Sequence, residues 1–289
     1  MANLKEIRAR ISSVSSTMKI TSAMKMVSAA KLKKSQDRIA SIIPYSNSIN
    51  RIINNLLPSV NKSEINLSSA SSQSNKVLII TISSNRGLCG GFNANVFKKS
   101  KELIEKKLAK NEVEFFCIGK KSHESIKREG FNIYNYNSEI IEDGNSKKMK
   151  CELNEIIKKF SEGHWQGIYI VYNKFKNAAT QIITKEKLLP IEIDPEGGGN
   201  DTRDYIFEPD KTTIINGLLP KKIEIQLFKA ILDSIASEHG ARMTAMHKAT
   251  DNAQELKQNL TLSYNRQRQA AITNEILEIV AGAEALKGA

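Results

Sequence analysis

The distribution of proline constrains the fold of this 289-residue sequence more than any other feature. No proline occurs in residues 1–43 or in residues 221–289. Because proline lacks a backbone donor and clashes with the preceding turn, it is rare inside helices. The two proline-free stretches therefore predict long helices, and the residues between them alternate strand and helix patterns.

An apolar stripe with heptad spacing runs along both stretches, which is typical of paired helices. Its N-terminal members are Leu4, Ile7, Ile11, Val14 and Met18, followed at the same spacing by Thr21, Lys25 and Ser28 and then by Leu32, Ile39 and Ile42. Its C-terminal members are Met246, Ala249, Ala253, Leu256 and Leu260. We expect the two helices to form an antiparallel coiled coil whose seam turns small and polar midway along the first helix.

Composition sets the outer limits of the fold. With 40% hydrophobic and 6% aromatic residues in 289, the chain has enough apolar side chains for one ordinary core plus extended helices. No apolar run approaches the roughly 18 residues of a membrane span, and no signal segment opens the sequence, so we expect a soluble, non-exported protein. The basic, Ser-containing start also suits a mitochondrial transit peptide, but a cleaved segment has no need of a heptad stripe.

Cysteine and histidine spacing indicates no metal site. Cys89, Cys117 and Cys151 form no C-x-x-C pair, which favours a reducing compartment, and Cys117 lies in an apolar run typical of a core. His239 and His247 are eight residues apart, unlike the i,i+4 pair of a zinc-binding helix, and are expected on the surface or in the seam.

Positive charge is concentrated at the N-terminus. The formal net charge is +12, and residues 1–43 hold nine Lys and Arg against two acidic residues. Three explanations remain open at this point: a helix that binds nucleic acid, a helix that sits among acidic protein surfaces, or an ordinary solvated face.

The middle of the chain predicts an α/β domain with a parallel or mostly parallel sheet. Strands are expected at 76–84, 113–119, 131–136 and 165–175, with an edge strand near 179–193. The predicted organisation is an N-terminal coiled-coil helix (1–58), a Ser-rich linker (59–75), the central domain (76–194), a second linker (195–209) and a C-terminal coiled-coil helix (210–289).

A glycine-rich turn, NRGLCGGFN at 85–93, follows the first predicted strand. Gly87, Gly90 and Gly91 do not satisfy G-x-G-x-x-G, and no acidic residue ends the second strand, so a Rossmann-like sheet without a nucleotide site is expected. The glycines favour a tight turn, and Arg86 is left to face a partner. No catalytic motif occurs elsewhere, so no catalytic residue, cofactor or metal is predicted.

Three segments carry a resemblance to a known family: ISSVSSTMKITSAMKMVSAAKL (11–32), the turn at 85–93, and the pair 237–253 and 260–286. Together they resemble the γ subunit of the bacterial-type F-type rotary ATP synthase, without the paired-cysteine insert of chloroplast relatives. The resemblance implies a non-catalytic central rotor stalk of a proton-translocating complex, peripheral on the cytoplasmic face of the plasma membrane. Its implied partners are the α and β subunits, the ε subunit and the c-ring, and acidic parts of β would then meet the basic helix.

The resemblance also implies roles for individual residues. The residues implied in torque contact with the α/β ring are Met24, Lys25, Arg242, Arg268, Gln269 and Thr273. The residues implied in a smooth bearing tip are Ile276, Leu277, Ile279 and Val280. Arg86 and the turn glycines are implied only in support. Two positions depart from the family pattern: Asn85 replaces an acidic residue, and Gly240 replaces an alanine and is expected to soften the helix.

A basic coiled-coil protein that binds nucleic acid is the main alternative, and a Rossmann-type enzyme is the third possibility. Single-stranded nucleic acid is bound through aromatic side chains interleaved with basic ones, and residues 1–43 contain no aromatic residue.

Overall fold

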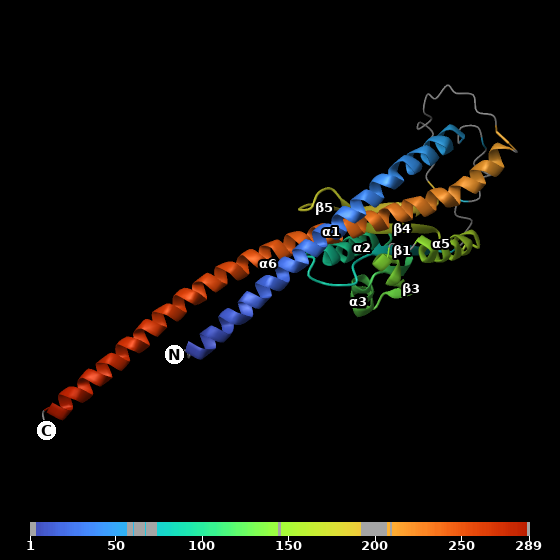
Figure 1. Cartoon of the computed structure of the whole chain (residues 1–289). Helices are drawn as coiled ribbons and strands as arrows, with labels where there is room; N and C mark the ends of the chain where they lie inside the picture. Colours follow the sequence, from blue (N-terminus) through green and yellow to red (C-terminus); the bar gives the residue numbers. More distant parts are fainter. Residues whose placement is uncertain are drawn as a thin grey trace. The chain divides into compact units, whose positions relative to one another are not determined.

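A computed structural model describes residues 4–56, 60, 67, 74–143, 146–191, 207–208 and 210–287. The two predicted linkers, 59–75 and 195–209, fall almost entirely outside the described residues. Contacts divide the chain into two compact units, which are described separately. One unit holds the residues up to 27 together with those from 243 onward, and the other holds residues 28–242. The elements, labelled in Figure 1, are α1 (Leu4–Leu56), β1 (Lys76–Ile82), α2 (Phe92–Lys107), β2 (Glu112–Ile118), α3 (Lys120–Arg128), β3 (Asn132–Asn137), α4 (Glu139–Asp143), α5 (Ser146–Ser161), β4 (Gly167–Phe175), β5 (Gln181–Leu189) and α6 (Lys211–Lys287).

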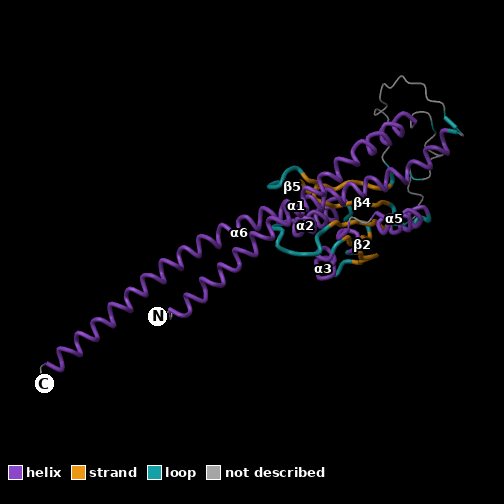
Figure 2. Tube along the Cα trace, viewed as in Figure 1, coloured by secondary structure: helices purple, strands orange, loops and turns teal. Residues whose placement is uncertain are grey.

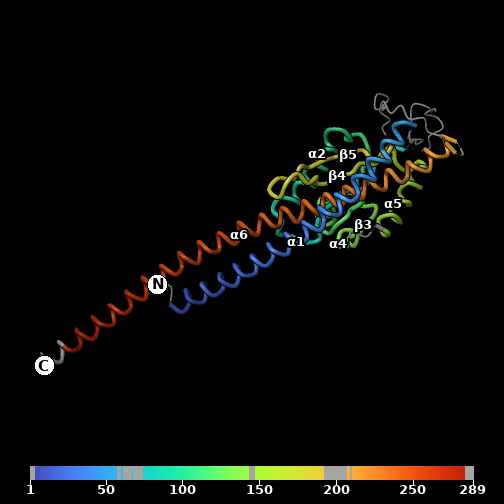
Figure 3. Tube along the Cα trace, turned by 45° about the horizontal axis from the view of Figure 1, so that its top comes forward, coloured from blue at the N-terminus to red at the C-terminus, as the bar shows by residue number. Residues whose placement is uncertain are grey.

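The first unit is an antiparallel pair of helices (Figure 3). Arg8 bonds to Tyr264, and Thr21 bonds to Thr250, so residue numbers rise along α1 as they fall along α6. Thr21 is 8% exposed and its hydroxyl lies 2.8 Å from that of Thr250. The coiled coil predicted from the heptad stripe is therefore confirmed, including its small polar middle.

One predicted seam residue is wrong. Leu256 is 49% exposed, whereas Ala253 is buried and Lys257, Leu260 and Tyr264 are half-buried. Beyond Ala253 the seam steps by four residues to Lys257, not by three to Leu256. The long aliphatic stem of lysine can cover apolar surface while its ammonium group stays in water.

The second unit contains a five-stranded sheet in the order β3-β2-β1-β4-β5, whose strands are orange in Figure 2. β1 pairs in parallel with β2 and β4, β2 pairs in parallel with β3, and β5 is antiparallel at the edge. Six of the seven residues of β1 are buried, as expected for a central strand covered on both faces. The predicted mostly parallel sheet and its edge strand are confirmed.

Alternate residues of β1 supply two hydrophobic cores, because side chains of a strand alternate between its faces. Val77 and Ile79 pack with residues of α2 and α3. Leu78 and Ile80 pack with residues of α5, of the end of α1 and of the first part of α6. The end of α1 and the first part of α6 thus form one layer of the sheet unit, and Trp165, 2% exposed, lies in the same core.

Candidate functional site

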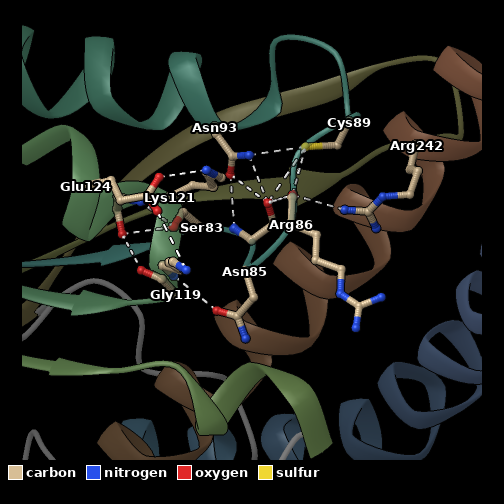
Figure 4. A network of polar contacts seen from close by, with 12 residues as sticks. Ser83, Asn85, Arg86, Cys89, Asn93, Gly119, Lys121, Glu124 and Arg242 are labelled. Carbon is tan, nitrogen blue, oxygen red and sulfur yellow. Dashed lines mark hydrogen bonds and ion pairs between the residues drawn. The ribbon is translucent and has the colours of Figure 1, made fainter.

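The glycine-rich turn after β1 is held in place by its own side chains (Figure 4). The Ser84 hydroxyl donates to the Arg86 carbonyl at 2.6 Å, and the Ser84 amide donates to Asn93 Oδ1 at 3.0 Å. Leu88 and Gly90 have φ angles of 63° and 59°, a region that glycine enters freely and leucine rarely. The turn is therefore internally hydrogen-bonded, and Cys89 is buried within it.

Asn85 joins this turn to two neighbouring helices. Its Oδ1 accepts from the Lys120 amide at 3.0 Å, and its Nδ2 donates to the Ser138 carbonyl at 2.9 Å and to Glu142 Oε1 at 3.2 Å. Lys120 begins α3, so the amide oxygen satisfies one of the free donors at that helix start. The neutral side chain at 85 thus has a structural role that uses both an acceptor and a donor, and a carboxylate would supply only acceptors.

Arg242 is the centre of a buried polar cluster, the Arg242 network, made of Arg242, Glu238, His239 and the carbonyls of Arg86 and Gly87. Arg242 Nη2 lies 2.8 Å from Glu238 Oε1, and both side chains are 9% exposed. The same nitrogen donates to the Arg86 and Gly87 carbonyls at 3.3 and 3.4 Å. Helix α6 is thereby fastened to the turn (Figure 4).

Burial sets the protonation of this network. Burial raises the pKa of Glu238, and the charge of Arg242 opposes that shift. Burial, with the charges of Arg242 and Lys31, lowers the pKa of His239 to about 4. His239 is therefore neutral near pH 7, so the prediction of a surface or seam histidine gives way to a half-buried ring within the sheet unit.

Gly240 has a packing role that the sequence did not indicate. A Cβ at this position would lie 3.3 Å from the Ala178 Cα and 3.3 Å from Phe175 Cε2. Glycine lets α6 approach the loop between β4 and β5 more closely than alanine would. The expectation of an exposed helix interior at this position is wrong, because Gly240 is buried against that loop, and the expected softening of the helix stays a prediction.

The residues expected to contact a partner ring fall into two groups. Arg268, Gln269 and Thr273 are exposed on α6; Thr273 Oγ1 donates to the Gln269 carbonyl at 2.9 Å. Met24 and Lys25 are half-buried on α1, and Lys25 Nζ lies 3.4 Å from His247 Nδ1.

Arg242, by contrast, already has a carboxylate and two carbonyls as partners within the chain. Its contact with a ring stays a prediction, as do the other assignments. No role for Glu238 was predicted from the sequence. A Glu and an Arg four residues apart on a helix form a recognised pairing pattern, which could have indicated it.

The end of α6 carries an exposed apolar surface, the apolar tip, which is formed by Ile276, Leu277, Ile279 and Val280. These side chains are between 50% and 71% exposed. Tyr264 bonds to Arg8, one turn after the first described residue of α1, so α6 continues past its partner helix to Lys287 (Figure 1). The tip therefore has no helix of this chain to cover it among the described residues.

The described ranges also bear on two other classes of site. No group of three or more His, Cys, Asp or Glu in these ranges is arranged to hold a metal ion. None of the described helices combines the length and the apolar character that crossing a membrane requires.

Comparison with known proteins decides the family. The ATP synthase family matches residues 3–286 of the chain. The chain is 49% identical over 289 residues to the ATP synthase gamma chain of Christiangramia forsetii and 51% identical over 290 residues to that of Flavobacterium psychrophilum, covering 100% of both sequences in each case. The chain belongs to the ATP synthase gamma chain family. This membership favours the rotor interpretation over the nucleic-acid and Rossmann-enzyme alternatives.

A solved structure has the same fold at lower identity. In the rotor of the Euglena gracilis mitochondrial ATP synthase, in rotational state 1, one chain superposes with a TM-score of 0.62 at 19% identity, covering 93% of this chain and 98% of the other. The gamma-chain fold, a sheet unit with two long terminal helices, is therefore shared across a large sequence distance.

Proposed function

We propose that this chain is the central rotor stalk of a proton-translocating ATP synthase. In this role it carries rotation between a membrane c-ring and a catalytic ring of α and β subunits, and its sheet unit meets an ε subunit. The chain itself is non-catalytic and lies peripherally at the cytoplasmic face of a bacterial plasma membrane. Support comes from gamma-chain relatives that align over their whole length and from the rotor fold.

One observation carries the mechanical part of the proposal, namely the apolar tip. A rotor must not be held strongly at any one angular position. Uncharged side chains form no fixed ion pairs with the subunits around them. The tip exposes Ile276, Leu277, Ile279 and Val280, which suits sliding contact with an apolar sleeve. Below it Arg268 and Gln269 are exposed and provide polar groups that can transmit force to loops of the ring.

A direct test is to watch the chain rotate. Cys151 is exposed, whereas Cys89 and Cys117 are buried, so a bead can be attached at one natural thiol of the chain assembled with α and β subunits fixed to a surface. ATP should drive rotation in one direction, and a Cys151→Ser chain should carry no bead. ATP hydrolysis by this assembly with a bead that only diffuses would refute the rotor role.

A second test concerns the torque contact. Arg268→Ala with Gln269→Ala should lower turnover of the assembled complex about tenfold, equivalent to about 1.4 kcal/mol. Asn274→Ala is the control, because Asn274 is exposed on α6 and its side chain points at least about 120° away from both Arg268 and Gln269 around the helix. Equal rates for the double variant and the control would remove these two residues from the contact.

A further inference from the structure

A cavity of about 250 Å³ lies within the sheet unit, between the last part of α1, strands β4 and β5, and α6. Lys174, Lys222 and Lys229 line it, together with a single acidic residue, Glu186. We call it the lysine cavity. It is separate from the turn, the Arg242 network and the apolar tip.

The one carboxylate in the wall is already bonded by neutral donors. Glu186 Oε1 accepts from the Tyr172 hydroxyl at 2.7 Å, and Oε2 accepts from Gln226 Nε2 at 3.0 Å. These bonds hold the carboxylate against the wall. Glu186 forms no ion pair with a lysine of the cavity among the residues that the structure describes.

None of the three lysines forms an ion pair with another described residue. In the described part of the chain, neither Lys174 nor Lys222 nor Lys229 lies within 4 Å of a carboxylate oxygen. Burial lowers the pKa of Lys222, and no neighbouring charge offsets that shift. A half-buried ammonium group without a counter-ion is unfavourable, so an anion that enters the cavity would recover part of the lost solvation.

Two further groups bear on anion binding here. Asn50 also lines the cavity and can supply amide donors beside the three ammonium groups. Asp233 on α6 is 6% exposed and interacts electrostatically with Lys174 and Lys229. The charges of Lys229 and Lys174 lower its pKa, but burial outweighs them and raises it to about 6. The balance near neutral pH is therefore positive.

We propose that the lysine cavity is a binding site for a small oxyanion of the phosphate class. Its three ammonium groups outnumber the carboxylates of Glu186 and Asp233, and the oxygens of a tetrahedral anion can each accept from a different donor. Its volume is below the roughly 300–1,000 Å³ of pockets that enclose drug-sized ligands, so it suits inorganic phosphate or a single phosphate headgroup and not a whole nucleotide.

The test is calorimetric titration of the full-length chain with inorganic phosphate at constant ionic strength. We expect saturable binding of one phosphate per chain, and at least tenfold weaker binding by Lys222→Gln. Lys221→Gln is the matched control: it removes the same charge from the adjacent, exposed position on α6 and should bind as the wild type does. Equal weakening by both variants would show a diffuse charge effect and overturn the site.

Two additional measurements keep the test decisive. Bound phosphate should raise the urea midpoint of the wild type, because a ligand that binds only the folded state stabilises it, and Lys174→Gln should reduce this shift even if Lys222→Gln folds poorly. Vesicles containing phosphatidic acid distinguish the source of the group: capture by these vesicles, but not by phosphatidylcholine vesicles, assigns the site to a headgroup. Absence of binding to both millimolar phosphate and the acidic vesicles would refute the proposal.

Discussion

Removing Arg242 while keeping Glu238 should strongly destabilise the sheet unit. At 2.8 Å two unit charges attract by about 6 kcal/mol at an effective dielectric constant of about 20, but burying both ions costs several kcal/mol each. The intact pair is therefore close to neutral for stability. Arg242→Met retains most of the aliphatic volume and leaves an uncompensated buried carboxylate, which we expect to cost about 3–5 kcal/mol.

The assay is urea unfolding monitored by Trp165. It is the only tryptophan of the chain, is 2% exposed and lies in the same unit as Arg242. The double variant Glu238→Leu with Arg242→Met is the control, because it removes both charges and should be much less destabilised than Arg242→Met alone.

The effect of pH provides a further check on the same variant. Without Arg242 the folded-state pKa of Glu238, already raised by burial, rises further above its unfolded value. The deficit of Arg242→Met should then shrink as pH falls from 8 to 5, because protonation removes the buried charge. A cost below about 1 kcal/mol that is independent of pH, or a double variant less stable than the single one, would refute the account of the network.

Three other predictions concern the helix contacts and the buried acid. Gly240→Leu should lower the free energy of unfolding in urea by about 1–3 kcal/mol, because it overpacks the contact with the β4–β5 loop. Gly217→Ala has nothing within 4 Å of the new Cβ and should stabilise the chain by up to about 1 kcal/mol. Equal effects of the two variants would exclude the packing role of Gly240. The pKa of Asp233 is raised from 3.8 to about 6, so its contribution to the free energy of unfolding should fall by up to about 3 kcal/mol as pH rises from 4 to 7. The stability of Asp233→Asn, measured by unfolding at several pH values, should lack this loss. A variant with the same pH profile as the wild type would contradict the prediction. Ala249→Pro should destabilise the coiled coil by roughly 3 kcal/mol or more and abolish ATP-driven acidification of vesicles that carry the complex. Proton pumping per ATP hydrolysed at the wild-type ratio would show that a continuous helix is not required at this position.

The sequence was most informative where a repeat determines which face is buried. The spacing of Leu4, Ile7 and Ile11 continues along α1, and the buried strand β1 is an unbroken apolar run. The Leu256 prediction failed because hydrophobicity alone favours leucine over Lys257, and only the geometry of the partner helix shows which of the two enters the seam.

The polar contacts were harder to predict because their partners are distant in sequence. Arg242 bonds to carbonyls of Arg86 and Gly87, more than 150 residues earlier, and no local pattern indicates such a bond. Gly240 looked like a weak point by helix propensity, yet its lack of a Cβ is what the neighbouring loop requires. Both sites depend on how the layers of the sheet unit meet.

The apolar tip has a consequence for the chain before it finds its partners. A helix end that exposes Ile276, Leu277, Ile279 and Val280 is a surface on which newly made copies adhere to one another or to chaperones. Unassembled copies should be short-lived, since quality-control proteases recognise such surfaces. Under the proposed rotor role, the amount of this chain in a cell would be limited by the supply of the subunits proposed to cover the tip, and excess synthesis would yield degradation products in place of free stalks.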